Sequence, residues 1–189
     1  MACPAAMNHP ETILRTLDRH LTRPVRLILY GRAALALGFP DSPSEFSATM
    51  DVDAILPRVE LSAIEKNDDF WSALERSNTE LEPSGLYITH LFVDDQLILT
   101  PDWTQRLKAV QLEDLKFLQL FRPDAGDLIL TKMMRVDPQD RSDIAFLLDR
   151  FSGNITKDYI ERASLPELDE IREAFSVNRE WLAQRLIAD

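Results

Sequence analysis

The apolar residues of the first two thirds of the chain switch between helical and strand spacing. Ile13, Leu17 and Leu21 recur on one side of a 3.6-residue period, which predicts a helix that a proline then ends. The segment 25–30 is rich in aliphatic residues and reads as a buried strand. The whole pattern predicts helices over residues 10–21, 32–37 and 62–81, strands over residues 25–30, 49–56, 86–93 and 117–121, and a hairpin strand over residues 96–99.

From about residue 124 onward the apolar spacing is helical. The predicted helices cover residues 127–135, 140–151, 156–163 and 166–188. We therefore predict an α/β core over residues 1–122 and a helical extension over residues 123–189 that packs on it. The fold class is α/β (α+β): a small mixed sheet flanked by helices, followed by a C-terminal helical bundle.

Length and composition agree with a folded protein and exclude several classes of protein. The 189 residues are 45% apolar and 28% charged, which allows a core and excludes a wholly disordered chain. A single cysteine, Cys3, excludes a disulfide framework and a cysteine-based zinc site. The same cysteine usage agrees with a reducing compartment, so we expect a cytoplasmic protein.

The charge balance limits the partners. A formal net charge of −11 repels a phosphate backbone, so we expect no broad duplex DNA surface, whereas a nucleotide needs only a few local cations. Residues 1–10 lack the features of a signal peptide, and no apolar run approaches the roughly 20 residues of a membrane span. We therefore expect no membrane partner.

Two aspartates lie within one predicted strand. Because side chains alternate along a strand, Asp51 and Asp53 point the same way, about 6.5–7 Å apart, while Met50 and Val52 face the apolar side. Two carboxylates in this arrangement can hold a hard divalent cation such as Mg²⁺ or Mn²⁺. The alternative is an Asp-x-Asp pair on a solvent-facing sheet edge, although aspartate is depleted in strands.

A strand–glycine–helix unit precedes this strand. Gly31 separates the strand 25–30 from the helix 32–37, and a glycine there lets a ligand approach the backbone. The first N–H groups of the helix can bind an anion, and Arg32 can add a phosphate contact. The alternative is a tight turn with no ligand.

Together these segments resemble the minimal nucleotidyltransferase superfamily, with its polymerase-beta-like fold, and within it the AbiEii-type abortive-infection toxins and their uncharacterised relatives. The first motif of those relatives, Gly-Gly-x-Ala-Leu, is similar to Gly31-Arg32-Ala33-Ala34-Leu35. The second, Arg-x-Thr-x-Asp-[Ile/Leu]-Asp, is similar to Ser47-Ala48-Thr49-Met50-Asp51-Val52-Asp53. A third, downstream similarity covers Asp127-Leu128-Ile129-Leu130-Thr131-Lys132 and then Asp140-Arg141-Ser142-Asp143-Ile144.

The resemblance implies a site and a reaction. Asp51 and Asp53 would hold Mg²⁺, or Mn²⁺, against the phosphates of a nucleoside triphosphate. The nucleotide-binding residues would be Gly31, Arg32, Thr49, Lys132 and Arg141. Outside the resemblance, a lysine such as Lys132 is commonly a surface residue, and Asp140 with Arg141 would serve equally as a helix cap with a surface ion pair.

Three positions depart from the family pattern. Arg32 stands where the family has a small residue, Ser47 stands where it has an arginine, and a third carboxylate is not evident. The best strand for that carboxylate, residues 86–93, carries His90 instead. We predict His90 as a third catalytic residue, a metal ligand or a base; the alternative is a half-buried, hydrogen-bonded histidine.

Three functions follow from these observations. The first is a metal-dependent nucleotidyltransferase that moves a nucleotide from an NTP to a hydroxyl of an RNA, a protein or a small molecule, with a relation to toxin–antitoxin systems. The second, favoured by the missing carboxylate, is a catalytically weak or inactive binding module of the same fold that acts through a partner protein. The third is an unrelated α/β fold with a chance Asp-x-Asp.

Overall fold

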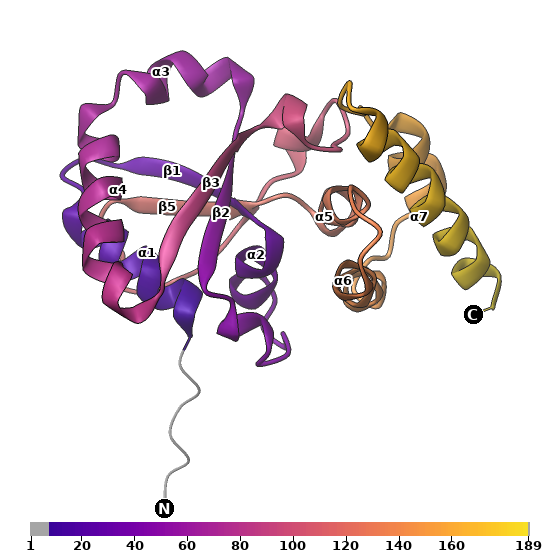
Figure 1. Ribbon diagram of the computed structural model, residues 1–189, viewed down its shortest axis with the longest axis horizontal. Helices are drawn as coiled ribbons and strands as arrows, with labels where there is room; N and C mark the ends of the chain where they lie inside the picture. Colours follow the sequence, from indigo (N-terminus) through magenta and orange to yellow (C-terminus); the bar gives the residue numbers. More distant parts are fainter. Residues whose placement is uncertain (1–7, 189) are drawn as a thin grey trace, which may run out of the picture. The chain divides into compact units, whose positions relative to one another are not determined.

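A computed structural model describes residues 8–188 of the chain (Figure 1). Cys3 and most of the segment considered as a signal peptide lie outside the described residues. The helices are α1 (His9–His20), α2 (Gly31–Gly38), α3 (Leu61–Glu65), α4 (Asp68–Leu81), α5 (Ala125–Lys132), α6 (Pro138–Leu148) and α7 (Asp169–Ala188). The strands are β1 (Val25–Tyr30), β2 (Asp51–Leu56), β3 (Tyr87–Val93), β4 (Lys108–Ala109) and β5 (Leu118–Arg122).

The chain divides into two compact units. The first contains the residues up to Phe92 together with Lys108–Arg122, and the second contains Val93–Leu107 with the residues from Pro123 onward. One boundary between the units falls after residue 122, and residues 93–107 group with the C-terminal part.

The first unit is built on a mixed sheet with the strand order β3-β2-β1-β5-β4. The central strand, β1, pairs antiparallel with β2 and parallel with β5. It is buried on both faces, because Leu27, Ile28 and Leu29 are each at most 2% exposed. The predicted α/β class with a small mixed sheet is therefore confirmed.

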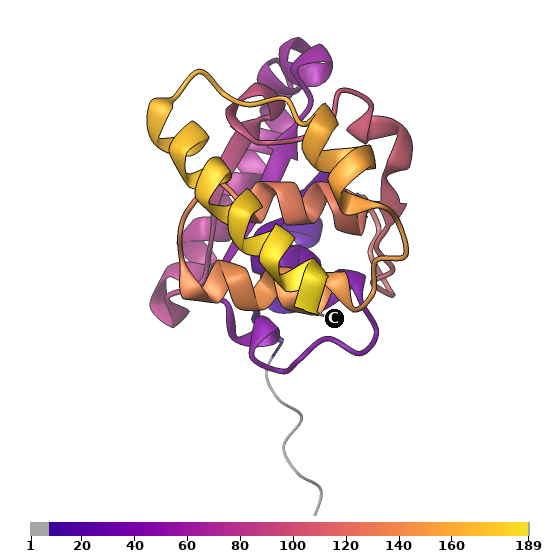
Figure 2. The same cartoon turned by 90° about the vertical axis from the view of Figure 1, so that its right-hand side faces the viewer.

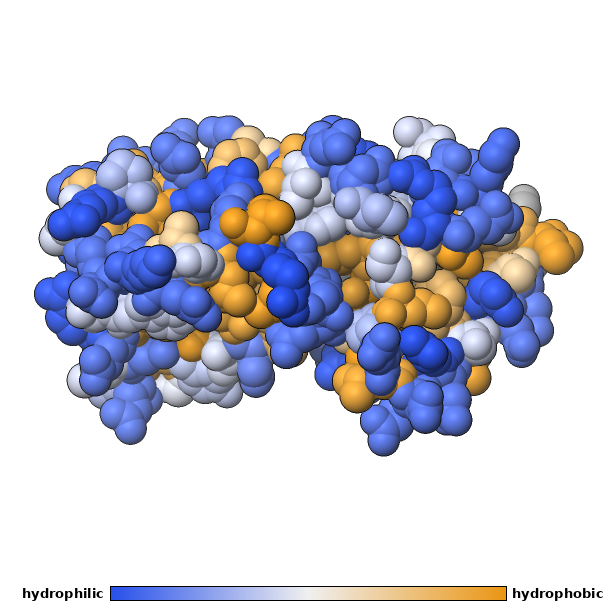
Figure 3. Space-filling view, turned by 90° about the horizontal axis from the view of Figure 1, so that it is seen from above, coloured by the Kyte–Doolittle hydropathy of each residue, from blue (hydrophilic) through white to orange (hydrophobic). Residues whose placement is uncertain are grey.

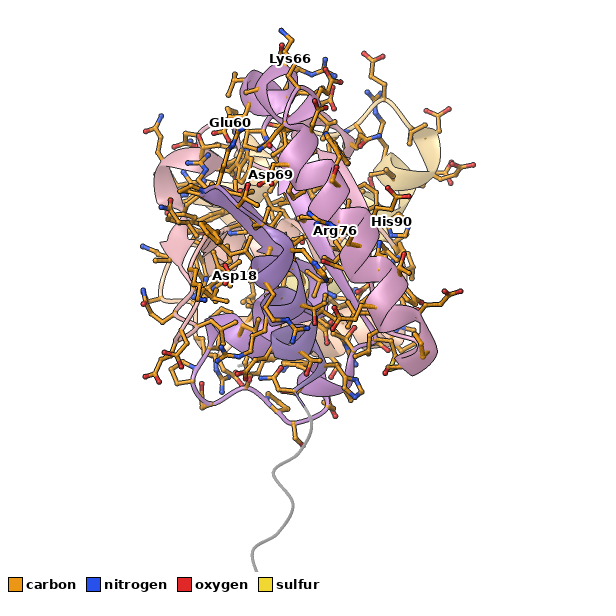
Figure 4. The ribbon with its side chains drawn as sticks, turned by 90° about the vertical axis from the view of Figure 1, so that its left-hand side faces the viewer. Asp18, Glu60, Lys66, Asp69, Arg76 and His90 are labelled. Carbon is orange, nitrogen blue, oxygen red and sulfur yellow. The ribbon has the colours of Figure 1, made fainter. Side chains whose placement is uncertain are left out.

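Helices α1 and α4 pack against each other in this unit, and α1 also contacts β2 (Figure 4). Asp18 on α1 fixes the start of β5, because its buried carboxylate accepts hydrogen bonds from the N–H groups of Lys116, Phe117 and Leu118, each 2.8 Å long. Helix α1 thereby holds a strand that lies about a hundred residues further along the chain.

The second unit contains α5, α6 and α7, and Figure 2 shows α7 crossing in front of the other two helices. Arg106 connects the segment 93–107 to α5, with ion pairs of 3.0 Å to Asp124 and 2.7 Å to Asp127. The Tyr159 hydroxyl also donates to Asp124, at 2.6 Å. This network explains why residues 93–107 belong with the C-terminal part.

Three predicted elements differ in the structure. The helix expected over residues 62–81 is two helices, because the Asn67 side chain accepts the Phe70 N–H and begins α4 anew. The hairpin strand over residues 96–99 is absent, since Gln96 closes a turn onto the Val93 N–H and Leu99 bridges to Ser164 instead. The helix over residues 156–163 is a π-helical turn, Ile155–Tyr159, followed by a 3₁₀ turn.

Hydrophilic residues cover most of the face seen in Figure 3, and groups of apolar residues lie between them. Within residues 8–188, every helix is too short or too polar to span a bilayer.

Candidate functional site

Strand β2 presents the two aspartates as the alternation predicted. Val52 and Ala54 are fully buried, whereas Asp51 and Asp53, which alternate with them, are partly exposed. Met50 departs from the prediction, because it precedes the strand and is 42% exposed. The two carboxylates therefore lie on the face of β2 opposite the core residues.

Thr49 and Asp51 form the first contact of the site. The Thr49 hydroxyl donates a 2.8 Å hydrogen bond to Oδ1 of Asp51. This hydrogen bond, from a residue two positions earlier in the chain, orients the Asp51 carboxylate. Thr49, which the family resemblance assigned to nucleotide binding, thus lies directly beside one of the two proposed metal ligands.

Gly31 lies beside the other carboxylate. The β1–β2 register places Tyr30, the last residue of β1, opposite Asp53, so the next residue begins α2 at the same level. Gly31 has a φ of +65°, and a Cβ added there would lie 3.5 Å from Oδ2 of Asp53. A glycine is favoured here because of the left-handed backbone, whereas an added methyl group would stand in ordinary van der Waals contact with the carboxylate.

Strand β3 completes the surroundings of Asp53. The Thr89 hydroxyl donates a 2.7 Å hydrogen bond to Oδ1, and Nδ1 of His90 lies 3.4 Å from the same oxygen. The His90 side chain is 64% exposed, so it is not the half-buried histidine of the alternative interpretation. Figure 4 shows His90 on the far side of α4 from Asp18, at the edge of this unit.

Sequence reasoning missed Thr89. Thr89 belongs to the predicted strand 86–93, so the sequence did place it in a strand. Its hydroxyl reaches Asp53 because that strand lies next to β2. Only the strand order makes the two residues neighbours, and the sequence does not give that order.

Arg32, expected at the phosphates, lies on α2 with its guanidinium over the Phe46 ring, 5.3 Å from the ring centroid. A cation stacked on an aromatic ring keeps its charge and its planar donors. The bulky residue at this family position is thus accommodated against the 3₁₀ turn that contains Phe46.

The remaining predicted nucleotide ligands lie in the second unit. Lys132 is buried, and its ammonium contacts Asp140 at 3.1 Å and Asp143 at 2.7 Å, so it is not the surface lysine of the alternative interpretation. Asp140 also pairs with Arg135, and the cap of α6 is Asp137 rather than Asp140.

Arg141 is engaged with α7. Its guanidinium lies 5.1 Å from the centroid of the Trp181 ring and donates a long, 3.4 Å hydrogen bond to Asn178. The structure therefore gathers Gly31, Thr49, Asp51, Asp53 and His90 in the first unit, and it gives Lys132 and Arg141 partners within the second unit. Their roles in nucleotide binding stay predictions.

The donors around Asp53 suit a hard cation. Carboxylate and hydroxyl oxygens are the ligands that Mg²⁺ prefers, and Mg²⁺ commonly uses one or two carboxylates with substrate phosphates and water. Among residues 8–188, no group of three or more histidine, cysteine, aspartate and glutamate side chains is arranged around one metal position.

An apolar strand, a helix that begins at a glycine beside a carboxylate, and an antiparallel strand with Asp-x-Asp agree with the nucleotidyltransferase-like fold that the resemblance implied. The family described as "Nucleotidyltransferase of unknown function (DUF6036)" matches residues 11–181, and the chain belongs to this family. Among curated proteins and among solved structures, nothing matches the chain. The finer likeness to AbiEii-type toxins stays a prediction.

Proposed function

We propose that this nucleotidyltransferase transfers a nucleotide from an NTP to a hydroxyl acceptor with the help of Mg²⁺ or Mn²⁺. The observation that carries the proposal is the convergence of Gly31, Thr89 and His90 on the carboxylate of Asp53, with Asp51 two residues before it on β2. Asp51 and Asp53 would hold the cation. When bound, the cation would neutralise phosphate charge and lower the pKa of the acceptor hydroxyl.

The residues of the chain supply the rest of the reaction. Gly31 leaves room for phosphate oxygens beside Asp53 and places the first N–H groups of α2 next to them. The acceptor oxygen attacks the α-phosphorus, the bond from that phosphorus to the bridging oxygen breaks, and pyrophosphate leaves. His90, which is exposed beside Asp53, would take the proton of the acceptor hydroxyl.

Calorimetric titration of ATP, GTP, CTP and UTP, each with and without Mg²⁺, tests the nucleotide site. We expect binding that depends on Mg²⁺ in the wild-type protein and its loss in the Asp51→Asn/Asp53→Asn double variant, because neutral amides lose the attraction for the cation. Asp68→Asn, an exposed aspartate at the start of α4, serves as the control. Binding that survives in the double variant would contradict the proposal.

A second candidate is a nucleotide-binding module that turns over slowly or not at all. It is favoured by the position of His90 on the strand where the family pattern expects a third carboxylate. Release of pyrophosphate in the presence of an acceptor separates the two functions. We expect His90→Ala to lower this release while the nucleotide affinity is kept, and release that stays at the rate without enzyme would favour the binding module.

The cellular context is also a proposal. A cytoplasmic location would supply the NTP and the cation, and a relation to toxin–antitoxin systems would supply a partner protein. Co-expression with the product of the neighbouring gene, followed by affinity purification, tests the partner. The absence of any co-purified product would argue against it.

A further inference from the structure

A groove of about 680 Å³ runs along α4 and β3, and all of its lining residues belong to the first unit. The helix side carries Glu75 and Asn78, which lie on one face of α4, and Glu82, which directly follows that helix. The strand side carries Tyr87 and Thr89. None of these residues belongs to the proposed metal ligands, but Thr89 touches one of them.

The groove lies beside the first half of β3, which is an edge strand of the sheet. β3 is the outermost strand of the order β3-β2-β1-β5-β4, so β2 is its only strand neighbour among the described residues (Figure 1). The Tyr87 N–H donates to the Met50 carbonyl next to β2, and the main-chain groups of a strand alternate in direction. The N–H and C=O groups of Ile88, His90 and Phe92 therefore point away from the sheet.

Asn78 shows what this edge accepts. Its amide Nδ2 donates to the Ile88 carbonyl at 3.1 Å, and its Oδ1 accepts the Ile88 N–H at 2.8 Å. An amide side chain here makes the pair of hydrogen bonds that a peptide group of an added strand would make. Beyond Ile88, the outward groups of His90 and Phe92 continue the same edge toward the site, and no strand within residues 8–188 pairs with them.

The negative charge of the groove favours a positively charged ligand. Glu75 and Glu82 are exposed on its wall, and the whole chain carries a net charge of −11. Carboxylates repel the phosphates of RNA and attract lysine and arginine side chains. Tyr87, which is 42% exposed, offers an aromatic surface to the same occupant. A basic polypeptide thus fits both the backbone groups and the charge.

The groove is continuous with the proposed reaction centre. Thr89 lines the groove and donates its hydroxyl to Asp53 at 2.7 Å. A strand paired with His90 and Phe92 would pass this point, and its side chains would alternate toward and away from the carboxylates.

We propose that the acceptor is an extended, basic polypeptide segment that adds to the open edge of β3 and presents a serine, threonine or tyrosine hydroxyl at Asp53. This inference rests on the proposed function and names its acceptor class. The bond formed is between the side-chain oxygen and the α-phosphorus, the bond broken is the one to pyrophosphate, and the hydroxyl proton leaves to His90 or water.

The test uses the full chain with Mg²⁺ and all four NTPs labelled at the α-phosphate. Probes are short peptide pools with a central serine, threonine, tyrosine or alanine in either lysine-rich or glutamate-rich surroundings, and total tRNA. We expect label on the basic, hydroxyl-bearing pools and none on the alanine pool or on tRNA. Label on tRNA, or equal label on acidic and basic pools, would overturn the inference.

Two variants probe the groove itself. Thr79→Trp, from an exposed residue of the groove wall, should lower peptide labelling about tenfold by filling the groove. Glu75→Lys/Glu82→Lys should reverse the preference from basic to acidic pools. The controls are Ser72→Trp and Glu65→Lys, exposed positions outside the groove. Labelling that resists both groove variants would contradict the inference.

Two further measurements keep the outcomes separate. Nucleotide binding by calorimetry should be unchanged in Thr79→Trp; if the wild-type protein binds no nucleotide, the proposed function fails. Peptide binding in the groove is then measured without nucleotide: we expect slower amide hydrogen exchange in β3 when the basic peptide pool is added. Unchanged exchange would refute the proposed peptide site. Label on the protein itself, with dimers in sedimentation, would show a second copy as the occupant and also refute it.

Discussion

At the scale of single residues, substitutions of Gly31 and Gly85 distinguish the effect of backbone strain from an effect on ligand binding. Both have a φ of +65°, but an added Cβ would meet Oδ2 of Asp53 at Gly31 and the Met50 side chain at Gly85, each at 3.5 Å. We expect Gly31→Ala and Gly85→Ala to lower the free energy of unfolding by a similar amount, about 1–2 kcal/mol. Chemical denaturation measures this loss.

Only the first of these variants should affect the nucleotide. The methyl group at position 31 would occupy the space beside Asp53 that a phosphate needs, so we expect Gly31→Ala to weaken Mg²⁺-dependent nucleotide binding about tenfold. Gly85→Ala should bind as the wild type does. Equal affinities for the two variants would argue against a phosphate beside Gly31.

At the scale of elements, Lys132 on α5 forms ion pairs that connect this helix to α6. Its ammonium is buried between Asp140 and Asp143, which are 2% and 0% exposed. Lys132→Met keeps the length of the side chain and leaves both carboxylates without this cation, so we expect a loss of about 3–5 kcal/mol in stability. Lys66→Met, an exposed lysine after α3, should cost far less.

The same variant distinguishes the structural role of Lys132 from the predicted phosphate contact. Thermal unfolding and nucleotide titration are measured on Lys132→Met and on Lys132→Arg, which keeps the charge. A stable Lys132→Met protein that no longer binds nucleotide would show that the amine serves the ligand. A destabilised protein that still binds when folded would show that it serves α5 and α6.

Tyr159 links pH to stability at the scale of the whole molecule. Burial raises the pKa of the Tyr159 hydroxyl above its ordinary value of 10.0, and its hydrogen bond to Asp124 raises it further. The folded state therefore holds this proton more tightly than the unfolded state. We expect full stability from this group below pH 10 and a progressive loss as the pH rises above that value.

Denaturation across the alkaline range tests this expectation. Tyr159→Phe should flatten the alkaline decline and lower stability near neutral pH by about 1 kcal/mol, the value of one hydrogen bond. Tyr87→Phe, an exposed residue of β3, should change neither. An alkaline decline that persists unchanged in Tyr159→Phe would assign it to other groups.

The positions of β1 and α1 and the shared face of the two aspartates followed from the sequence alone. Residues 25–30 are aliphatic or aromatic except for Arg26 and gave β1 with its bounds correct, and the spacing of Ile13 and Leu17 gave α1. Aspartates at alternate positions of one strand must share a face, because the period of a strand is two residues. These features are local, so the sequence determines them.

Contacts between distant segments decided the rest. Thr89 reaches Asp53 only because β3 lies next to β2, and Lys132 is buried only because Asp140 and Asp143 on α6 surround it. Asn67 divides a helix that its apolar spacing would continue, since a side-chain cap competes with the backbone. Strand order, ion-pair partners and caps depend on which residues meet in space, and local periodicity does not carry that information.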